Sequence, residues 1–296
     1  MKTTAQWLDI SPGQSKFIHT WHPDRAPHAN VAIIHGLGEH GGRYAPLASR
    51  FVEAGFSASA FDQQGHGRSP ESRGTIRSYQ SLLSDISDFL RWNRTQHPEV
   101  PTVLFGHSMG GNLVINVALR EAAEPGYVIS SSPMLEKATP VSPTAIWLAR
   151  CLLRIAPNLK LYSQIVAERL MSDPVEQQML RDDELFHNQM SLRLGAGLVD
   201  SGQWALQHAD RLRAPLLLSH GTSDYMTSCE ASVQFARRAG ERCQLVVLDA
   251  ELHDPFRSLH RDTVISRYVD FIHQAVRANE QSQGLHTGPK AQELGR

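Results

Sequence analysis

The sequence contains few cysteines, no excess of charge of either sign and no apolar run long enough to cross a bilayer. Its three cysteines, Cys151, Cys229 and Cys243, are too few and too scattered for a disulfide framework or a zinc cluster. Because 29 basic residues balance 30 acidic ones to a net charge of −1, we expect no nucleic-acid partner. The longest apolar stretch, 145–155, is interrupted by two arginines, which excludes a transmembrane helix there.

The first seven residues carry one positive charge and no continuous apolar segment, so the sequence predicts no signal peptide. Together with the scarcity of cysteine, this favours a cytoplasmic protein, with peripheral contact at a membrane surface as a further expectation. Hydrophobic residues make up 41% of the chain, and 21 glycines and 16 prolines are an ordinary share. A packed globular core is therefore expected and general disorder is excluded.

Short apolar runs alternate with helical patterns along most of the chain, which predicts an α/β fold with a mostly parallel sheet covered on both faces. Residues 32–34 and 216–218 are apolar without alternation, as strands buried on both faces should be. An antiparallel hairpin at the edge is predicted from 6–10 and 16–21. The other strands are expected at 31–35, 56–61, 102–105, 127–129, 215–218 and 244–248, and the helices at 43–54, 78–95, 112–123, 229–238 and 262–276.

The alternation stops once, between Met134 and Arg213, where helical pieces are punctuated by prolines and no clear strand is evident. Because the strand pattern resumes at 215–218, this segment is predicted to be an insertion into one α/β unit. We therefore expect three parts, namely a core of residues 1–133 and 214–279, a helical cap at 134–213, and a disordered polar tail at 280–296.

The first strong motif is a G-x-S-x-G sequence at 106–110, with Ser108 at its centre. It falls between a predicted strand and a predicted helix, so the chain turns directly from one into the other at Ser108. Such a turn strains the backbone, admits only small residues two positions away on either side, and exposes the serine oxygen above the sheet. The helix N-terminus also favours negative charge there. Ser108 is therefore the predicted nucleophile, with a glycine-rich structural turn as the alternative.

A nucleophilic serine needs a base, and in this kind of fold the base follows the last strand. His253 lies in the loop that leaves the predicted strand at 244–248, and it is the expected base. His260 and His273 are the alternatives. They fall at the start and in the body of the last predicted helix, where a histidine more often lies on the surface.

The acid that orients the base should leave the preceding strand, because the chain order is serine, acid, histidine. Asp224 follows the strand at 215–218 by a few residues, which makes it the expected acid. It would hold one tautomer of the histidine and stabilise the imidazolium that forms when the serine attacks. Asp249 and Asp254 are alternatives close to His253 in sequence.

A glycine-rich loop follows the first core strand, at 35–44. Its backbone amides can face the serine, and the N–H groups of Leu37 and Met109 are the expected oxyanion hole. The same loop also reads Gly36-x-Gly38-x-x-Gly41 with Asp62 about 20 residues on, which is the dinucleotide fingerprint of an NAD(P)-dependent oxidoreductase. Against that alternative, Glu39 would place a carboxylate where a pyrophosphate must bind.

A metal site is the weaker interpretation of this loop. His35, Glu39 and His40 have the spacing H-x-x-x-E-H, and the glycines among them prevent the rigid helix that would align metal ligands. We therefore expect no metal and no cofactor.

Four stretches together resemble the monoacylglycerol lipase and lysophospholipase branch of the α/β-hydrolases, of the serine aminopeptidase S33 type. They are HGLGEHGGRY at 35–44, DQQGHGRS at 62–69, GHSMGG at 106–111 and HGTSD at 220–224. The resemblance extends from about residue 31 to residue 276. It implies an eight-stranded, mostly parallel sheet, a helical cap between the sixth and seventh strands, and hydrolysis of esters of single-chain acyl lipids, monoacylglycerol or lysophospholipid, without a cofactor.

The resemblance also assigns roles to individual residues. The implied nucleophile, acid and base are Ser108, Asp224 and His253, the implied oxyanion donors are Leu37 and Met109, and the residues that line or support the alcohol-side pocket are Glu39 and Arg43. One position departs from the pattern. Animal monoglyceride lipases have a second histidine three residues after the base, where this sequence has Phe256. This places glycerol in doubt as the leaving alcohol and keeps a lysophospholipid open.

Other functions use the same residues and stay open at this point. A peptidase or an acyltransferase would form the same acyl-enzyme, and a general carboxylesterase would differ only in substrate. A non-catalytic scaffold of the same fold, which binds a ligand or partner, is a further alternative. An aspartate nucleophile is excluded because the motif carries Ser108.

The predicted cap contains one helix, at 143–157, that is apolar over most of its circumference. Pro143 suits its first turn and Pro157 ends it, while Arg150 and Arg154 form a narrow polar stripe. Such a helix is either buried or meets something apolar on a second face. Two interpretations follow. The helix packs across the core, or one of its faces covers the acyl pocket while another touches lipid.

Overall fold

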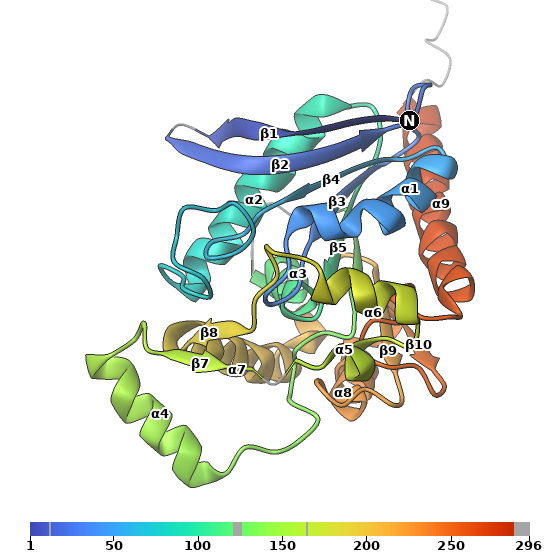
Figure 1. The fold of residues 1–296 in the computed structure, drawn as a ribbon. Coiled ribbons are helices and arrows are strands. Elements are labelled where there is room, and N and C mark those ends of the chain that lie inside the picture. The colour runs from blue at the N-terminus through green and yellow to red at the C-terminus, as the bar shows by residue number, and fades with distance from the viewer. Residues whose placement is uncertain (12, 121–125, 164, 287–296) are drawn as a thin grey trace, which may run out of the picture.

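The computed structural model describes residues 1–11, 13–120, 126–163 and 165–286. Its centre is an eight-stranded sheet in the order β1-β2-β4-β3-β5-β6-β9-β10 (Figure 1). β1 pairs with β2, and β2 with β4, in antiparallel orientation. From β4 onward, neighbouring strands of the sheet pair in parallel. The strands are β1 Lys2–Ser11, β2 Gln14–His22, β3 Asn30–Ile34, β4 Ser57–Phe61, β5 Thr102–His107, β6 Tyr127–Ser131, β9 Leu216–Gly221 and β10 Cys243–Leu248. This confirms the predicted α/β fold.

Helices cover both faces of the sheet, and each face has its own apolar core. α1 and α9 contribute to the core on one face, while α2, α3, α7 and α8 contribute to the core on the other. Every residue of β3 and β9 is buried, which explains why residues 32–34 and 216–218 are apolar without alternation. These helices are α1 Ala45–Glu53, α2 Tyr79–Gln96, α3 Met109–Arg120, α7 Leu192–Gln207, α8 Cys229–Ala239 and α9 Arg261–His286.

The segment 134–213 leaves the sheet after β6 and returns to it at β9, and it lies over the ends of the strands (Figure 1). No strand was expected here, but two short ones pair as an antiparallel ribbon. Each has three residues, which is too short for a period-two pattern to show in the sequence. Its elements are α4 Pro143–Ile155, β7 Lys160–Tyr162, α5 Ala167–Leu170, α6 Pro174–Arg181, β8 Gln189–Ser191 and α7.

The last helix, α9, runs to His286 and so continues past residue 280, where a disordered tail was expected. The polar residues after 280 carry no helix-breaking proline before 286, so the helix propagates through them. The remainder of the expected tail, 287–296, and residues 121–123 of the expected helix at 112–123 lie outside the described residues. Within the described part of the chain, no helix has the length and apolar character needed to cross a bilayer.

Candidate active site

The G-x-S-x-G motif forms a sharp turn between β5 and α3. Ser108 has a φ of 54°, a left-handed conformation that is unfavourable for a residue with a side chain. A Cβ on Gly106 would lie 2.3 Å from the Gly110 carbonyl oxygen, and one on Gly110 would lie 2.1 Å from the Ile34 carbonyl oxygen. Only glycine fits at these two positions, where the sequence predicted small residues, and the close packing that they permit holds the strained serine in place.

Ser108, His253 and Asp224 form one hydrogen-bonded chain. The Ser108 Oγ lies 2.9 Å from the His253 Nε2, and the His253 Nδ1 lies 2.7 Å from the Asp224 Oδ2. The three side chains come from three separate strand ends, after β5, β9 and β10, which meet at the same edge of the parallel sheet. With its Nδ1–H held by the carboxylate, His253 presents a free Nε2 lone pair to the serine hydroxyl, so the arrangement can deprotonate it.

Asp224 is held by more groups than the sequence revealed. Its Oδ1 accepts hydrogen bonds from the backbone N–H groups of Met226 and Thr227, and its Oδ2 lies 3.0 Å from the Nε2 of His220. Burial acts to raise the pKa of this carboxyl, but the His253 charge and hydrogen bonds from both imidazoles hold the pKa of Asp224 far below its usual value. Asp224 therefore stays ionised throughout the working pH range.

The environment of His253 favours its charged form. Burial acts to lower the pKa of His253, but the charge and hydrogen bond of Asp224 outweigh it and raise that pKa above 6.5. The carboxylates of Asp254 and Glu39 add to this rise. An imidazolium that forms during the attack of Ser108 would be stabilised by the same charges.

The alternative acids and bases are engaged elsewhere. Asp254 lies 2.7 Å from the Nε2 of His107, and Asp249 is exposed, with the Thr222 hydroxyl 3.4 Å away. His260 is mostly exposed and pairs with Glu251, on the outside of the site. His273 belongs to α9, which covers the other end of the sheet, where its ring contacts Phe56.

The loop after β3 approaches the nucleophile closely. A Cβ on Gly36 would lie 3.4 Å from the Cβ of Ser108, so the backbone at 36–37 runs beside the serine. The Gly36 N–H donates to the Glu39 Oε2 at 2.9 Å, which fixes the loop. Leu37 and Met109 both line the same cavity as Ser108, and Met109 begins α3, where a backbone N–H has no partner inside the helix.

Glu39 anchors a buried charge network behind this loop. Its Oε1 accepts hydrogen bonds from the Arg43 Nε at 3.2 Å and the Arg257 Nη1 at 2.6 Å, while its Oε2 also accepts from the Tyr44 hydroxyl at 2.8 Å. Burial raises the pKa of Glu39, but the two guanidinium groups bring it well below its usual value. Glu39 lines the cavity, whereas Arg43 lies behind Glu39 and is not among the lining residues.

Sequence reasoning missed Arg257, which joins this network to the residue beside the serine. Its Nη1 donates to the Glu39 Oε1 and, at 2.9 Å, to the Asp254 Oδ2, and Asp254 in turn holds His107. No local pattern marks this arginine, because it follows Phe256 in a short turn and its partner Glu39 lies 218 residues away. Only the fold brings the two charges together.

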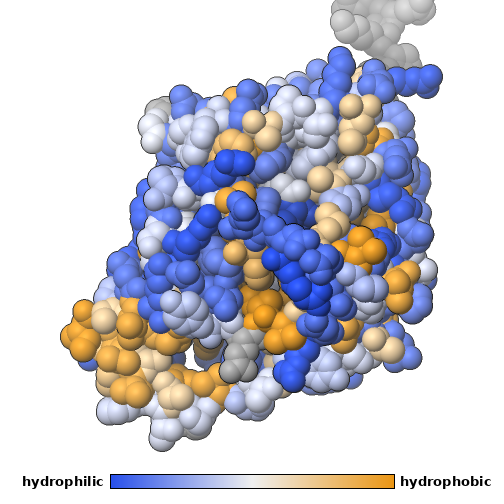
Figure 2. Space-filling model, in the orientation of Figure 1, coloured by the Kyte–Doolittle hydropathy of each residue, from blue (hydrophilic) through white to orange (hydrophobic). Residues whose placement is uncertain are grey.

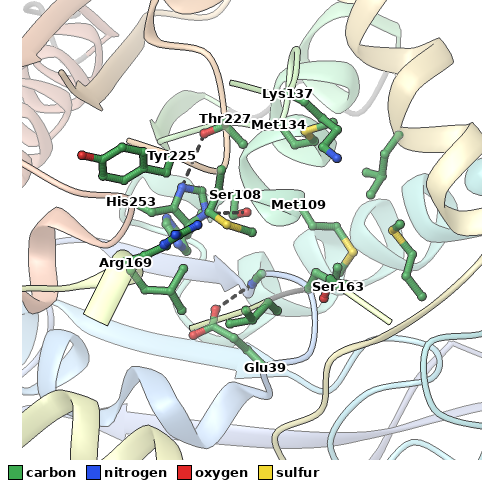
Figure 3. A pocket seen from close by; sticks show the side chains of 18 of the residues that line it. Glu39, Ser108, Met109, Met134, Lys137, Ser163, Arg169, Tyr225, Thr227 and His253 are labelled. Carbon is green, nitrogen blue, oxygen red and sulfur yellow. Dashed lines mark hydrogen bonds between the residues drawn. The ribbon is translucent and has the colours of Figure 1, made fainter. Parts of the chain in front are cut away.

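A cavity of about 490 Å³ opens at Ser108. In Figure 3, His253 and Arg169 lie on one side of Ser108, and Met109 and Met134 lie on the other. The lining is mainly apolar, with methionine and leucine side chains from α3, α7, β8 and the segment 134–190. A cavity of this size and polarity suits an apolar chain of a small-molecule substrate, with its reactive group at Ser108.

The structure offers little to a dinucleotide or a metal. Where a pyrophosphate would bind, the Gly36 N–H already donates to the Glu39 carboxylate. Two groups of side chains have potential ligand atoms within 4.8 Å of one another, as judged over the described residues. One is His107, His253 and Asp254, which belong to the site above. The other contains Asp62, whose oxygens accept backbone N–H groups and so stabilise the loops.

Comparisons with known proteins agree with this geometry. The family profile described as "Serine aminopeptidase, S33" matches residues 25–259. A monoacylglycerol lipase of Mycolicibacterium smegmatis is 30% identical over 254 residues, which cover 85% of this chain and 90% of that protein. An uncharacterized abhydrolase domain-containing protein of Dictyostelium discoideum is 33% identical over 92% of this chain, although the chain spans only 29% of its length. The crystal structure of a Paleococcus ferrophilus monoacylglycerol lipase superimposes with a TM-score of 0.79 at 29% identity and covers 88% of this chain and 99% of that one.

Proposed function

The chain belongs to the serine aminopeptidase S33 family of α/β-hydrolases and is a serine ester hydrolase, and we propose that it cleaves single-chain acyl esters through Ser108, His253 and Asp224. The observation that carries this proposal is the unbroken chain of short hydrogen bonds from Asp224 through His253 to a strained serine at the mouth of an apolar cavity. We assign Leu37 and Met109 as the oxyanion donors, and residues 134–213 as a cap that encloses the acyl chain.

The proposed reaction is a two-step acyl transfer. His253 removes the proton as the Ser108 oxygen attacks the ester carbonyl, and the two backbone N–H groups stabilise the oxyanion. His253 then gives this proton to the departing alcohol oxygen, which leaves an acyl-enzyme on Ser108. Water, activated by the same imidazole, attacks the acyl-enzyme and releases the fatty acid.

The test is a panel of p-nitrophenyl esters of rising chain length, run with wild-type protein and with Ser108→Ala. Wild type should hydrolyse the panel, and the Ser108→Ala protein should lose at least about 10³-fold in kcat. A fluorophosphonate should add its phosphonyl group to Ser108, as read by peptide mass. Hydrolysis that survives the substitution would remove Ser108 from this role. An aminoacyl p-nitroanilide in the panel separates an esterase from a peptidase.

We propose that the site favours an anionic head group, as in a lysophospholipid. Glu39, which the resemblance places at the alcohol-side pocket, already receives two hydrogen bonds at each carboxylate oxygen, so it has no free lone pair for a substrate hydroxyl. Arg169 and Lys137 line the mouth of the cavity, and no carboxylate in the described ranges forms an ion pair with either. Arg169 lies on the His253 side of Ser108, where the leaving group departs (Figure 3).

This head-group preference is measured by comparing a lysophosphatidic acid with a monoacylglycerol of the same acyl chain. Arg169→Gln should lower kcat/KM for the phosphate ester by roughly fivefold more than for the neutral ester, because an exposed charge pair contributes little more than this. Arg242→Gln, at the opposite end of the sheet, is the matched control. An equal loss on both substrates would leave no role for Arg169 in head-group selection.

We also propose that α4 touches lipid during substrate uptake. Of the side chains described in this helix none is buried, and Trp147, Leu148 and Ile155 are 67%, 53% and 79% exposed. Figure 2 shows hydrophobic surface gathered over this helix, which projects from the body of the molecule. Exposed apolar side chains beside Arg150 and Arg154 suit the surface of an anionic membrane, and packing across the core does not describe this helix.

A further inference from the structure

Helix α7 contains three glycines, and each is unfavourable in a helix relative to alanine. They are Gly195, Gly197 and Gly202. None has a positive φ, so the backbone conformation does not require glycine at any of them. The atoms that surround each glycine must therefore explain why no larger residue stands there.

Close packing explains two of the three. A Cβ on Gly202 would lie 2.1 Å from the carbonyl oxygen of Leu135, so α7 could not approach that loop with any larger residue. A Cβ on Gly197 would lie 3.0 Å from the Cβ of Tyr79, which is an atom fixed to the backbone of α2. At both positions glycine is needed for the packing of the helix.

Gly195 has no such neighbour. The three nearest atoms to a Cβ there are Met190 Cε at 3.1 Å, Sδ at 3.4 Å and Cγ at 3.9 Å, all on one flexible side chain. Gly195 and Met190 both line the cavity that opens at Ser108. Leu198 and Val199, three and four residues further along α7, line it too, so this face of the helix forms one wall of the cavity.

The wall lies in the apolar part of the cavity. Met190 packs against the buried cluster that contains Met109 and Leu198, and Met109 lies on the side of Ser108 away from His253 (Figure 3). The leaving alcohol must depart near His253, which gives it a proton. The opposite side is therefore where the acyl chain would extend, and Gly195 is the place in its wall where a side chain is missing.

We propose that Gly195, together with the movable side chain of Met190, sets the depth of the acyl pocket and so the longest acyl chain that the enzyme accepts. This inference rests on the proposed function. Gly195 would be a specificity-determining residue that never touches the reacting atoms. A larger residue there would fill the space that the distal methylenes of a long chain occupy, while the ester would still reach Ser108.

The decisive variant is Gly195→Leu, which adds four carbon atoms to the wall. Each buried methylene contributes about fourfold to binding, so displacing three of them should lower the ratio of kcat/KM for a C14 ester to that for a C4 ester by about 60-fold. Ala196→Leu adds nearly the same bulk one residue later, at a position that does not line the cavity, and is the matched control. It should leave the ratio within about twofold.

Met190→Ala supplies the complementary change. In the Gly195→Leu background it should restore the C14 to C4 ratio by more than tenfold, because it removes the side chain that faces the added leucine. A ratio that is unchanged in Gly195→Leu, or one that falls equally in Ala196→Leu, would overturn the inference. A double variant that stays at the ratio of Gly195→Leu would overturn the part assigned to Met190.

A binding measurement separates this inference from the proposed chemistry. Fatty acids from C8 to C16 can be titrated calorimetrically into Ser108→Ala protein, with and without Gly195→Leu, because binding needs no reaction. Weakened binding confined to the longer acids supports the pocket depth, even if ester hydrolysis by the wild type is absent and the proposed function fails. Equal affinities for every chain length in both proteins would overturn the role assigned to Gly195. That outcome would not affect the test of ester hydrolysis.

Discussion

Asp224 shows how a single carboxylate determines the ionisation of the site. Two imidazoles face its Oδ2, that of His253 at 2.7 Å and that of His220 at 3.0 Å, and only the first also reaches Ser108. If His253 is the base, as proposed, its raised pKa leaves a fraction of the enzyme protonated and inactive near neutral pH. Activity should therefore rise with pH through a kinetic pKa above 6.5.

Asp224→Asn should change the rate and the pH profile together. Loss of the carboxylate should cost on the order of 10⁴ in kcat, because the imidazole is no longer held in the productive tautomer. Burial then acts on His253 against only the smaller effects of the Asp254 and Glu39 carboxylates, so the acid limb of kcat/KM should move to lower pH. Asp249→Asn, in an exposed loop, is the control and should change neither. A loss below tenfold would show that another carboxylate orients His253.

Three neighbouring imidazoles predict a second effect of pH, this time on stability. The rings of His35, His66 and His187 follow one another at centroid distances of 5.3 and 4.8 Å. Burial lowers the pKa of all three, that of His187 to about 4, and repulsion from neighbouring imidazoles of this group adds to the lowering for His66 and His187. Since the unfolded chain binds protons near pH 6.5 and the folded one does not, stability is complete above pH 6.5 and is lost as pH falls toward 4.

Urea unfolding at pH 7.5, 6.0 and 5.0 would measure this loss. Each of these histidines adds up to about 1.4 kcal/mol per pH unit to the slope of the free energy of unfolding. His66→Gln removes one titrating ring, so the slope should become shallower by up to that amount. Replacing an exposed histidine, as in His260→Gln, should leave it unchanged. Equal slopes in all three proteins would contradict the assignment.

At the scale of elements, glycines of two helices are expected to respond in opposite ways to the same substitution. Gly110→Ala places a Cβ 2.1 Å from the Ile34 carbonyl oxygen, so α3 must move off the sheet, and we expect a loss of about 3 kcal/mol or more. Gly195→Ala meets only the tip of Met190 and gains helix propensity, so it should be neutral or stabilising by up to about 1 kcal/mol. Denaturant midpoints of the two variants make the comparison. Similar losses in both would show that helix packing, not the pocket, explains Gly195.

The exposed helix α4 gives a second prediction at this scale. Replacing Trp147 and Leu148 by serine should leave rates on short soluble esters unchanged but lower liposome co-sedimentation and rates on micellar substrates, because apolar area that enters the interface is lost. The matched control replaces Val175 and Met179 of α6, which are 66% and 51% exposed, by serine. A parallel fall of both rates and of thermal stability in the α4 variant would show that the helix only supports the core.

The same elements show what a sequence can reveal. β3 and β9 were predictable because strands buried on both faces appear in the sequence as uninterrupted apolar runs, and their ends located the glycine loop and Asp224. β7 and β8 were not, because a three-residue strand has no periodicity and is defined only by its partner. The exposure of α4 was likewise undecided, since an apolar helix looks the same whether it faces a core or a membrane.

Within the site, residues that follow strand ends were predictable and residues that depend on distant partners were not. Ser108, Asp224 and His253 follow the ends of three strands in the chain order serine, acid, histidine. This order was enough to predict that they lie close together. His220, at the end of β9, was not among the expected site residues, yet it shares the carboxylate of Asp224. No sequence pattern pointed to Arg257, because its role is to neutralise Glu39, which lies 218 residues away in the chain.

At the scale of the whole molecule, a partly buried network joins the segment 134–213 to the edge of the sheet that carries Ser108. Asp183, in the loop after α6, accepts hydrogen bonds from the Arg43 Nη1 at 3.2 Å and lies 3.1 Å from the His40 Nε2. Arg43 continues to Glu39, and Glu39 holds the N–H of Gly36 beside the serine. The segment 134–213 and the glycine loop are thereby connected by charge, in addition to the backbone hydrogen bond that the His187 N–H donates to the Gly38 carbonyl oxygen.

Asp183→Asn tests this connection. It removes the charge that Arg43 and His40 face, so the free energy of unfolding should fall by about 1–3 kcal/mol. Because salt screens charge interactions, this loss should be smaller in 1 M salt, whereas the loss caused by an apolar substitution should not be. Because Arg257 still holds Glu39, the glycine loop should keep its place. We therefore expect KM for long-chain esters to rise about 3–10-fold while kcat on a short ester stays within twofold. Glu168→Gln, which breaks an exposed ion pair with Arg181 inside the cap segment, is the control and should alter neither quantity. A fall in kcat on short esters with KM unchanged would mean instead that Asp183 supports the proposed oxyanion loop itself. A change in the segment 134–213 would then alter the catalytic step as well as the binding of long chains.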